Sequence, residues 1–177
     1  MKQRAVFLDR DGVLNDSVIK NGKPYPPASI TELVISAEVL PALETLKELG
    51  YLLIGATNQP DVARGTTEQS AVEAINEKLL QNLPLNEIRV CYHDDKDNCS
   101  CRKPSPGLLL AAAKAYGIDL EASFMIGDRW KDIEAGQRAG CKTIFLDRQY
   151  QERHSDKAAD FSTVSLLEAA QWIKQNT

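Results

Sequence analysis

The sequence predicts an α/β fold, a doubly wound parallel sheet with helices on both faces. Short apolar runs alternate with longer segments of helical periodicity along the 177 residues. Chemically capable polar side chains follow four of the apolar runs, and ligands bind such sheets beyond the carboxyl ends of the strands. No repeat, low-complexity tract or linker interrupts this order, so we expect residues 1–177 to form a single domain.

Five strands are expected at the apolar runs, which are short and end in polar residues or glycine. They are residues 4–8, 51–59, 87–92, 123–128 and 142–147. Short runs of this kind, continuously apolar and bounded by turn residues, are typical of strands that are buried on both faces of a parallel sheet.

Helical periodicity predicts five helices between and after these strands. They are residues 38–50, a helix from Thr66 or Thr67 to about Leu83, residues 105–117, a helix that ends near Ala139, and residues 165–175. Gly50 and Gly117 suit the position just after a helix, and Ser105 with Pro106 suits a helix start. The inward face of the second helix is expected to hold Val72, Ile75, Leu79 and Leu80.

The composition is typical of a soluble globular protein, with 43% hydrophobic and 26% charged residues. A net charge of −4 without a dense Lys/Arg block argues against nucleic acid or an anionic membrane as the main partner. The N-terminal "MKQRAVFLDRDG" lacks the apolar core of a signal peptide, and no apolar run approaches about 18 residues. We therefore expect a cytoplasmic protein.

Two aspartates, Asp9 and Asp11, stand two residues apart where the first strand ends. A lone Asp-x-Asp is most often a turn in which aspartate accepts backbone hydrogen bonds. Here Gly12 frees the backbone to turn, and both carboxylates can face one pocket. One carboxylate can then attack while the other carries a proton for a leaving oxygen. Asp128 and Asp132 can complete the oxygen-rich site that magnesium prefers.

Three further residues supply positive charge or hydrogen-bond donors at the ends of other strands. Lys103 offers a fixed cation, and Thr57 and Asn58 offer donors for phosphate oxygens. Each alone reads as a surface lysine or an ordinary turn. Together with the aspartates they form the set that an in-line attack on phosphorus requires.

Four segments, "FLDRDGVLN", "TNQ", "RKP" and "GDRWKD", resemble in their order the four motifs of the haloacid dehalogenase superfamily phosphatases. The resemblance implies a Rossmann-like fold and an aspartyl-phosphate intermediate on Asp9, with Asp11 as general acid and base. It implies that Thr57 and Lys103 steady the phosphoryl group. It also implies Mg²⁺ held by Asp9, the backbone carbonyl of Asp11, and Asp128, with Asp132 just outside the coordination sphere.

A cluster of Cys91, His93, Cys99 and Cys101 supplies three thiolates and an imidazole, enough for a closed tetrahedral Zn²⁺ site. A Cys99–Cys101 disulfide is the alternative, but it would be tight and out of place in a reducing compartment. Four protein ligands leave no position for water, so the zinc is expected to be structural. Residues 91–103 are thus predicted to be a zinc loop that braces Arg102 and Lys103.

The cysteine cluster placed directly before "RKP" resembles the branch that contains D-glycero-D-manno-heptose 1,7-bisphosphate 7-phosphatase and the histidinol-phosphate phosphatases. That branch is essentially capless, and the resemblance implies a small phosphorylated metabolite as the substrate, with a sugar phosphate favoured. The substrate contacts expected on this basis are Asn15, Asn58, Gln59, Arg102 and Arg129. For Arg102 the alternative is a surface ion pair with an aspartate at 94, 95 or 97.

The chain departs from that branch at two places. Pro60 and Asp61 stand after "TNQ" where the branch has Ser-Gly, and residues 15–30 form an unusual proline-rich loop. Histidinol phosphate therefore stays open as an alternative substrate. Alternatives of another class are a phospho-accepting receiver domain and a zinc-dependent nucleic-acid binder. A receiver carries its acceptor aspartate after a middle strand rather than the first, and the acidic balance disfavours nucleic acid.

Overall fold

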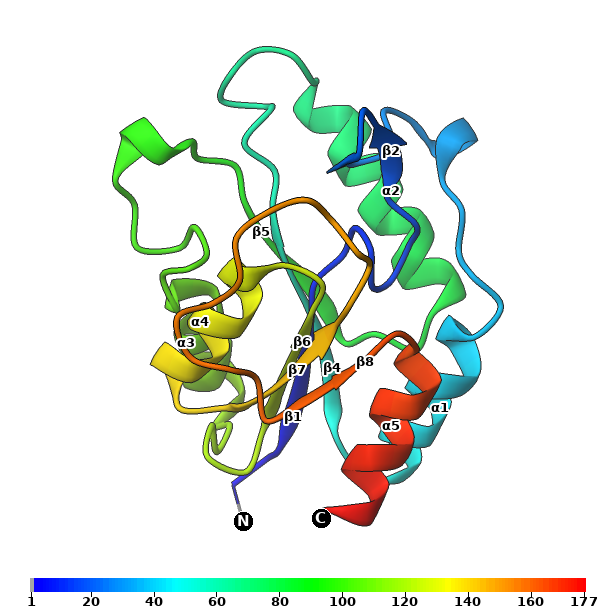
Figure 1. The fold of residues 1–177 in the computed structure, drawn as a ribbon, viewed down its shortest axis with the longest axis vertical. Helices are drawn as coiled ribbons and strands as arrows, with labels where there is room; N and C mark the ends of the chain where they lie inside the picture. The colour runs from blue at the N-terminus through cyan, green and yellow to red at the C-terminus, as the bar shows by residue number, and fades with distance from the viewer. Residues whose placement is uncertain (1) are drawn as a thin grey trace.

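A six-stranded, wholly parallel sheet forms the centre of the computed structural model, which describes residues 2–177 (Figure 1). Its strands in spatial order are β5 (Glu87–Cys91), β4 (Leu52–Asn58), β1 (Ala5–Leu8), β6 (Phe124–Gly127), β7 (Lys142–Leu146) and β8 (Phe161–Thr163). The predicted doubly wound α/β fold and its five strands are confirmed. The sequence did not predict β8, because a three-residue strand with a polar centre carries little hydrophobic signal.

Strand β1 lies between β4 and β6, where the order of the strands reverses. Its four residues are fully buried. Val6 and Leu8 belong to one hydrophobic cluster and Ala5 and Phe7 to the other, because alternate side chains of a strand point to opposite faces. The point of reversal is where ligands bind in such sheets, so Asp9 follows the strand best placed for a site.

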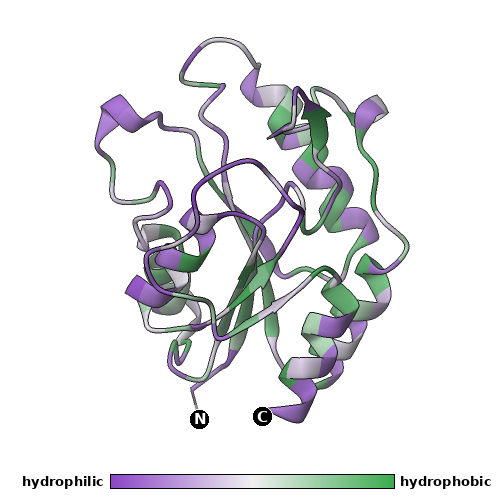
Figure 2. Cartoon of the chain, viewed as in Figure 1, coloured by the Kyte–Doolittle hydropathy of each residue, from purple (hydrophilic) through white to green (hydrophobic). Residues whose placement is uncertain are grey.

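Helices cover both faces of the sheet. One cluster joins the strands to α1 (Val39–Glu48), α2 (Gln69–Asn82) and α5 (Leu166–Gln175), and the other joins them to α3 (Gly107–Tyr116) and α4 (Trp130–Ala139). Apolar colour concentrates on the strands and on the helix faces that meet them (Figure 2). Two short 3₁₀ turns, Ile30–Glu32 and Asp95–Asp97, complete the helical segments.

Helix α2 departs from the prediction at its start and on one face. It begins at Gln69 after Glu68, and the backbone N–H groups of Thr66 and Thr67 bond to the carbonyl of Asp61 and close a turn before the helix. Leu80 is 40% exposed and does not face the core, whereas Val72, Ile75 and Leu79 do. Helix α3 likewise begins one residue later than predicted, with Pro106 rather than Ser105 at its cap position.

A small antiparallel hairpin of β2 (Val18–Lys20) and β3 (Lys23–Tyr25) lies within the proline-rich segment that was expected to be a loop. It stands beyond the carboxyl ends of the strands, and residues 2–177 place no larger domain there, so the essentially capless architecture is confirmed. In the described part of the chain no helix is both long and apolar enough to span a bilayer.

Candidate active site

Segments that follow β1, β4, β5 and β6 meet at one end of the sheet and line a cavity of about 520 Å³. Asp9 follows β1, Thr57 lies near the end of β4, and Asp128 follows β6. Lys103 reaches the same cavity from the loop after β5. The four sequence motifs are therefore brought together, as their positions at strand ends predict.

Lys103 lies at the centre of the site and is 2% exposed. Its Nζ donates to Asp9 Oδ1 at 2.8 Å and to the Ala56 carbonyl at 2.6 Å, and lies 2.6 Å from Asp132 Oδ1. Burial alone lowers the pKa of this lysine, but Asp132 and Asp9 more than offset that and raise it. Lys103 is therefore a permanent buried cation that holds one oxygen of Asp9 in place.

The carboxylates of Asp9, Asp128 and Asp132 crowd around this single lysine, and their oxygens lie within 4.8 Å of one another. Burial and then the neighbouring Asp132 raise the pKa of Asp9 to about 6. Burial and then Asp9 raise the pKa of Asp128 well above its usual value. Both oxygens of Asp128 are buried and make no hydrogen bond within residues 2–177. Three acids, one cation and two unpartnered oxygens fit a divalent, oxygen-seeking ion such as Mg²⁺.

Two glycines allow this close approach. Gly12 has φ +89°, and a Cβ there would lie 1.8 Å from Asp128 Oδ2. A Cβ on Gly127 would lie 2.1 Å from the Cβ of Asp132. Any larger residue at either position would push an aspartate away from the cluster.

Asp11 is held by donors on several sides. Gln59 Nε2 donates to Asp11 Oδ2 at 2.8 Å, and Asn15 Nδ2 donates to Oδ1 at 3.0 Å. Arg10, which is fully buried, pairs with Asp11 at 3.1 Å and donates to Asn76 Oδ1 on α2 at 2.9 Å. Asp11 lines the cavity, so its carboxylate is fixed beside the space where a substrate would bind.

Thr57 and Asn58 have different partners. Gln59 Nε2 donates to Thr57 Oγ1 at 2.9 Å, which leaves the hydroxyl hydrogen of Thr57 free to donate to a phosphate oxygen. The amide of Asn58 makes paired hydrogen bonds, 2.9 and 3.0 Å, with the backbone carbonyl and N–H of Lys103. Asn58 therefore positions Lys103, and its predicted contact with the substrate stays a prediction.

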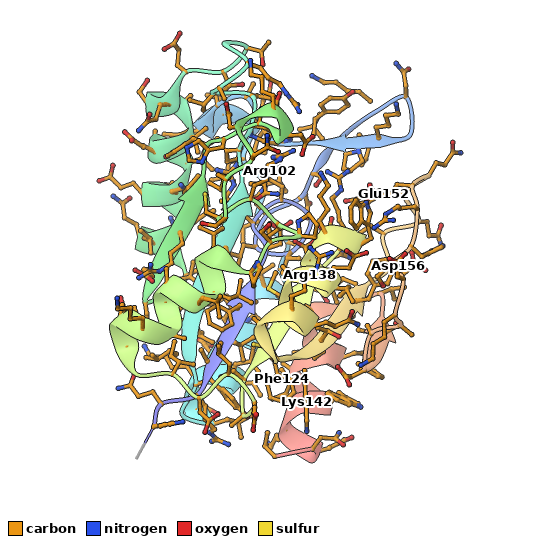
Figure 3. The ribbon with its side chains drawn as sticks, turned by 90° about the vertical axis from the view of Figure 1, so that its left-hand side faces the viewer. Arg102, Phe124, Arg138, Lys142, Glu152 and Asp156 are labelled. Atoms are coloured by element: carbon orange, nitrogen blue, oxygen red, sulfur yellow. The ribbon has the colours of Figure 1, made fainter. Side chains whose placement is uncertain are left out.

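Two of the five predicted substrate contacts, Asn15 and Arg102, do not line the cavity. Asn15 is 1% exposed and its amide bonds Asp11 instead. Arg102 Nε donates to Asp95 Oδ1 at 2.7 Å, the ion pair that the sequence left as the alternative. Gln59 and Arg129 do line the cavity, and Arg129 is paired with Glu152 at 2.6 Å. Arg102 and Glu152 both lie toward the end of the molecule opposite Phe124 and Lys142 (Figure 3).

The cysteine cluster lies in the loop after β5, and all four thiols of the chain are free. Cys101 Sγ lies 3.0 Å from Cys91 Sγ and 3.5 Å from Cys99 Sγ, and His93 Nδ1 lies 3.3 Å from Cys101 Sγ. A tetrahedral Zn²⁺ with bonds of about 2.3 Å separates its sulfur ligands by about 3.8 Å. The two sulfur separations from Cys101 are shorter than this, but all four ligand atoms lie within 4.8 Å of one another, so small side-chain shifts would place them around one zinc ion. The alternative Cys99–Cys101 disulfide is not formed.

Several residues of the cavity wall were not predicted as site residues. They are Ser17, Lys23, Pro24, Tyr25, Pro26, Pro60, Asp61, Arg64, Lys131, Tyr150, Gln151 and Glu152. Most come from the hairpin and from the segment that follows β7. The proline-rich composition of residues 15–30 was a signal of unusual structure there, but isolated charged or aromatic residues in loops carry no motif.

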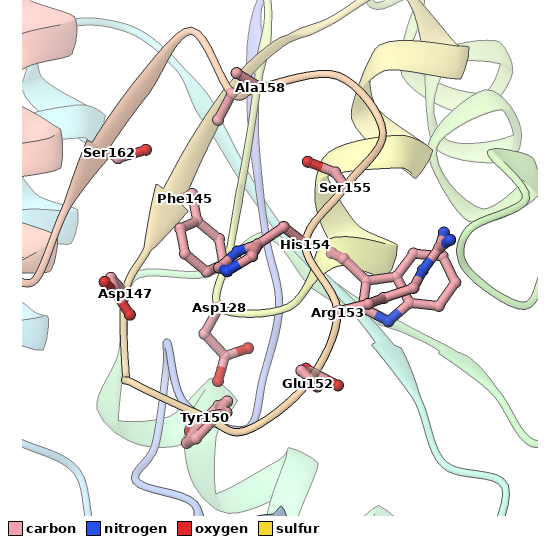
Figure 4. Close-up of a pocket in the computed structure, with 12 residues that line it drawn as sticks. Asp128, Phe145, Asp147, Tyr150, Glu152, Arg153, His154, Ser155, Ala158 and Ser162 are labelled. Carbon is pink, nitrogen blue, oxygen red and sulfur yellow. The ribbon is translucent and has the colours of Figure 1, made fainter.

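A second cavity of about 290 Å³ lies on the other side of Asp128, beneath the segment between β7 and β8 (Figure 4). Asp128, Tyr150 and Glu152 line both cavities. Arg153 of the same segment lies over the Trp130 ring at 3.6 Å and pairs with Glu134 at 2.7 Å. These contacts hold the segment against α4 and make it a wall of the active site.

Comparison with known proteins identifies the family. Residues 100–169 match a family model described as HAD-hydrolase-like. The chain is 32% identical to D-glycero-beta-D-manno-heptose-1,7-bisphosphate 7-phosphatase of Escherichia coli K12 over 185 residues, covering 97% of this chain and 94% of that protein. It is 38% identical over 149 residues to the Helicobacter pylori J99 protein of the same name, covering 81% of this chain and 82% of that one. The chain belongs to the family of D-glycero-D-manno-heptose-1,7-bisphosphate 7-phosphatases.

The fold of this chain is also similar to a solved structure of a heptose bisphosphatase. It is D,D-heptose 1,7-bisphosphate phosphatase from B. bronchiseptica complexed with magnesium and phosphate, with a TM-score of 0.82, 27% identity, and coverage of 99% of this chain and 100% of that one. The predicted resemblance to the haloacid dehalogenase phosphatases is confirmed. Membership of a heptose-bisphosphatase family also decides against the receiver domain and the zinc-dependent nucleic-acid binder.

Proposed function

We propose that the protein removes the 7-phosphate of D-glycero-D-manno-heptose 1,7-bisphosphate in a magnesium-dependent reaction. The observation that carries the proposal is the buried group of Asp9, Asp128, Asp132 and Lys103 at the floor of the cavity. The family relatives named for heptose bisphosphate support the choice of substrate. The whole chain 1–177 then acts as one phosphatase domain, and residues 91–103 form its zinc loop.

In the first half of the reaction, Asp9 attacks the phosphorus atom and displaces the sugar oxygen. Lys103 holds Asp9 Oδ1, and Asp9 Oδ2, which makes no hydrogen bond in residues 2–177, is the oxygen available for attack. Asp11 gives its proton to the leaving sugar oxygen as the P–O bond breaks. Thr57 donates to a phosphoryl oxygen as its charge grows. Lys103, whose Nζ contacts Asp9, Ala56 and Asp132, adds a fixed positive charge beside the phosphoryl group. Bound Mg²⁺ supplies positive charge that neutralises the phosphoryl group.

In the second half, Asp11 takes a proton from a water molecule that attacks the same phosphorus. The bond between Asp9 and phosphorus breaks. Inorganic phosphate leaves, and Asp9 becomes a free carboxylate again. Asp11 thus regains the proton that it gave up, and the enzyme returns to its starting state. Because Gln59 contacts both Asp11 and Thr57, it keeps the acid and the phosphate donor at a fixed separation.

The test of this function is phosphate release by the purified protein from a set of phosphate esters. Heptose 1,7-bisphosphate is expected to have the highest kcat/KM, well above histidinol phosphate and p-nitrophenyl phosphate. A higher kcat/KM for histidinol phosphate would show that histidinol phosphate, and not the heptose bisphosphate, is the substrate. Absence of turnover on every ester, with Mg²⁺ present, would contradict the phosphatase itself.

Magnesium is expected to stabilise the protein most above about pH 6. The raised pKa of Asp9 means that the folded, metal-free protein keeps a proton that the unfolded chain loses at lower pH. The free energy of unfolding of that protein therefore falls as pH rises from about 4 to about 6. Thermal melts with EDTA or with excess Mg²⁺ should show a larger Mg²⁺-induced rise in Tm at neutral pH than at about pH 5. An equal Mg²⁺-induced rise in Tm at both pH values, or no rise in the wild-type protein, would contradict the Mg²⁺ site. Asp128→Asn should reduce the Mg²⁺-induced rise in Tm.

Zinc is expected at about one ion per chain, held by the cluster of Cys91, His93, Cys99 and Cys101. Because four protein ligands enclose it, zinc should stay bound during a mild EDTA treatment that removes Mg²⁺ and stops turnover. Elemental analysis before and after that treatment checks the ratio. Cys141, a buried thiol outside the cluster, provides the control: Cys141→Ser should keep the zinc, whereas Cys99→Ser should lose it. A zinc-free protein with every cluster thiol open to titration would refute the site.

A further inference from the structure

Asp95 lies between two cations beside the mouth of the active site. Its Oδ1 accepts a hydrogen bond of 2.7 Å from Arg102 Nε and lies 3.7 Å from Lys131 Nζ. Arg102 and Lys131 are 10% and 22% exposed, whereas the Asp95 side chain is 70% exposed. An exposed carboxylate thus occupies the space between two largely covered cations, where the anionic group of a ligand could bind instead.

Lys131 is the cation of this pair that lines the catalytic cavity. Two arginines that also line the cavity have close carboxylate partners, since Arg64 pairs with Asp94 at 2.6 Å and Arg129 with Glu152 at 2.6 Å. Lys131 makes no hydrogen bond within residues 2–177, and 3.7 Å is its nearest ion pair there. Lys131 therefore has no close carboxylate partner, and the anionic group of a ligand in the cavity can bind it directly.

We propose that Lys131 binds the phosphate of the substrate that is not hydrolysed, and that Asp95 is an internal anion that competes for the same place. The proposal rests on the bisphosphatase function proposed above and names the residue that recognises the second phosphate. Arg102, which was predicted for this role, does not line the cavity, and its Nε is bonded to Asp95, so it contributes only after Asp95 has turned away. Asp95 is exposed on a short 3₁₀ turn, so its side chain can turn into solvent.

Competition between Asp95 and the second phosphate lowers the apparent affinity of the protein for the bisphosphate. When the binding-competent state is only partly populated, the apparent dissociation constant rises in inverse proportion to its population. Removing the charge of Asp95 should therefore favour the bisphosphate, and removing the charge of Lys131 should disfavour it. The two substitutions change the same local charge in opposite directions, so a general structural effect cannot produce both results.

The first measurement uses two substrates that differ only in the second phosphate, heptose 1,7-bisphosphate and heptose 7-phosphate. The ratio of their kcat/KM values should fall about tenfold in Lys131→Met, the scale of a lost hydrogen bond to a charged group. Lys114→Met is the matched control, since Lys114 is an exposed lysine in the last turn of α3, and it should leave the ratio unchanged. A ratio in Lys131→Met equal to that of wild type would overturn the assignment of Lys131.

The second measurement uses Asp95→Asn, which keeps the shape of the side chain and removes its charge. The bisphosphate to monophosphate ratio should rise about threefold, mostly through a lower KM for the bisphosphate. Glu44→Gln on α1, an exposed acid far along the chain from the site, is the matched control. A lower ratio in Asp95→Asn would mean that Asp95 orients Arg102 for the substrate, which would overturn the competition.

Failure of this inference and failure of the proposed function give different results. If wild-type protein hydrolyses p-nitrophenyl phosphate but neither heptose substrate, the proposed substrate is wrong, and with it the recognition of a second sugar phosphate. If wild type prefers the bisphosphate and neither variant changes that preference, the function stands and this inference is overturned.

Discussion

Asp9→Asn is expected to lower kcat by about 10⁴-fold or more, the scale seen when a catalytic nucleophile is removed. The amide keeps the size of the carboxylate, and its oxygen can still accept the hydrogen bond from Lys103. It cannot form the phosphoryl bond, and it offers the metal a weaker ligand. The loss should be similar for all phosphate esters, because each passes through the same attack.

The same substitution should leave the fold intact. Asp9 is one of three crowded acids around Lys103, so its removal relieves repulsion in the metal-free protein. We expect the Tm in EDTA to be equal to or higher than that of wild type, while the rise in Tm with Mg²⁺ becomes smaller. Asp16→Asn is the control, since Asp16 follows the same strand but does not line the cavity. Turnover by Asp9→Asn near the wild-type rate would refute Asp9 as the nucleophile.

Asp11→Asn is expected to reduce turnover of a sugar phosphate by about 10²- to 10⁴-fold, the usual contribution of a general acid and base. A sugar alkoxide is a poor leaving group and needs the proton, whereas a nitrophenolate leaves without one. The loss in the bond-breaking step should therefore be much smaller for p-nitrophenyl phosphate. Burst kinetics, which separate the release of nitrophenol from the later release of phosphate, provide the measurement.

The environment of Asp11 calls for a stability control. Arg10 is fully buried and pairs with Asp11, so the neutral amide weakens the partner of a buried guanidinium. Thermal melts of Asp11→Asn therefore accompany the kinetics, and the rates are compared where both proteins are folded. Equal loss on the aryl and sugar substrates, in a folded variant, would show that Asp11 is not the acid.

The sequence predicted the residues of the centre because each stands at the end of an apolar strand. Asp9, Thr57 and Asp128 follow that rule, and parallel strands bring their carboxyl ends to one edge. The partners of these residues were harder to predict. Asn58 and Lys103 are 45 residues apart and meet through backbone hydrogen bonds that no local spacing shows. Asn15 carries an amide suited to phosphate, yet the fold buries it against Asp11.

The walls of the cavity could not be read from the sequence for a different reason. The hairpin strands β2 and β3 have three residues each, and Pro24 lies within the second. The wall that contains Tyr150 and Glu152 has no regular secondary structure. Elements this short leave no hydrophobic period, so their place depends on contacts with the finished core, such as the pair of Glu152 with Arg129.

Arg10 connects helix α2 to the segment after β1 that carries Asp11. Its guanidinium spans from Asp11 to Asn76, which lies on α2 and does not line the cavity. An apolar side chain at position 76 would leave part of a fully buried cation without an acceptor, which the protein tolerates poorly. As relatives diverge, positions 10 and 76 should therefore change together, and an ancestor that lost one would be expected to lose the other soon after. Position 76 on α2 is therefore constrained by the active site, although it does not line the cavity.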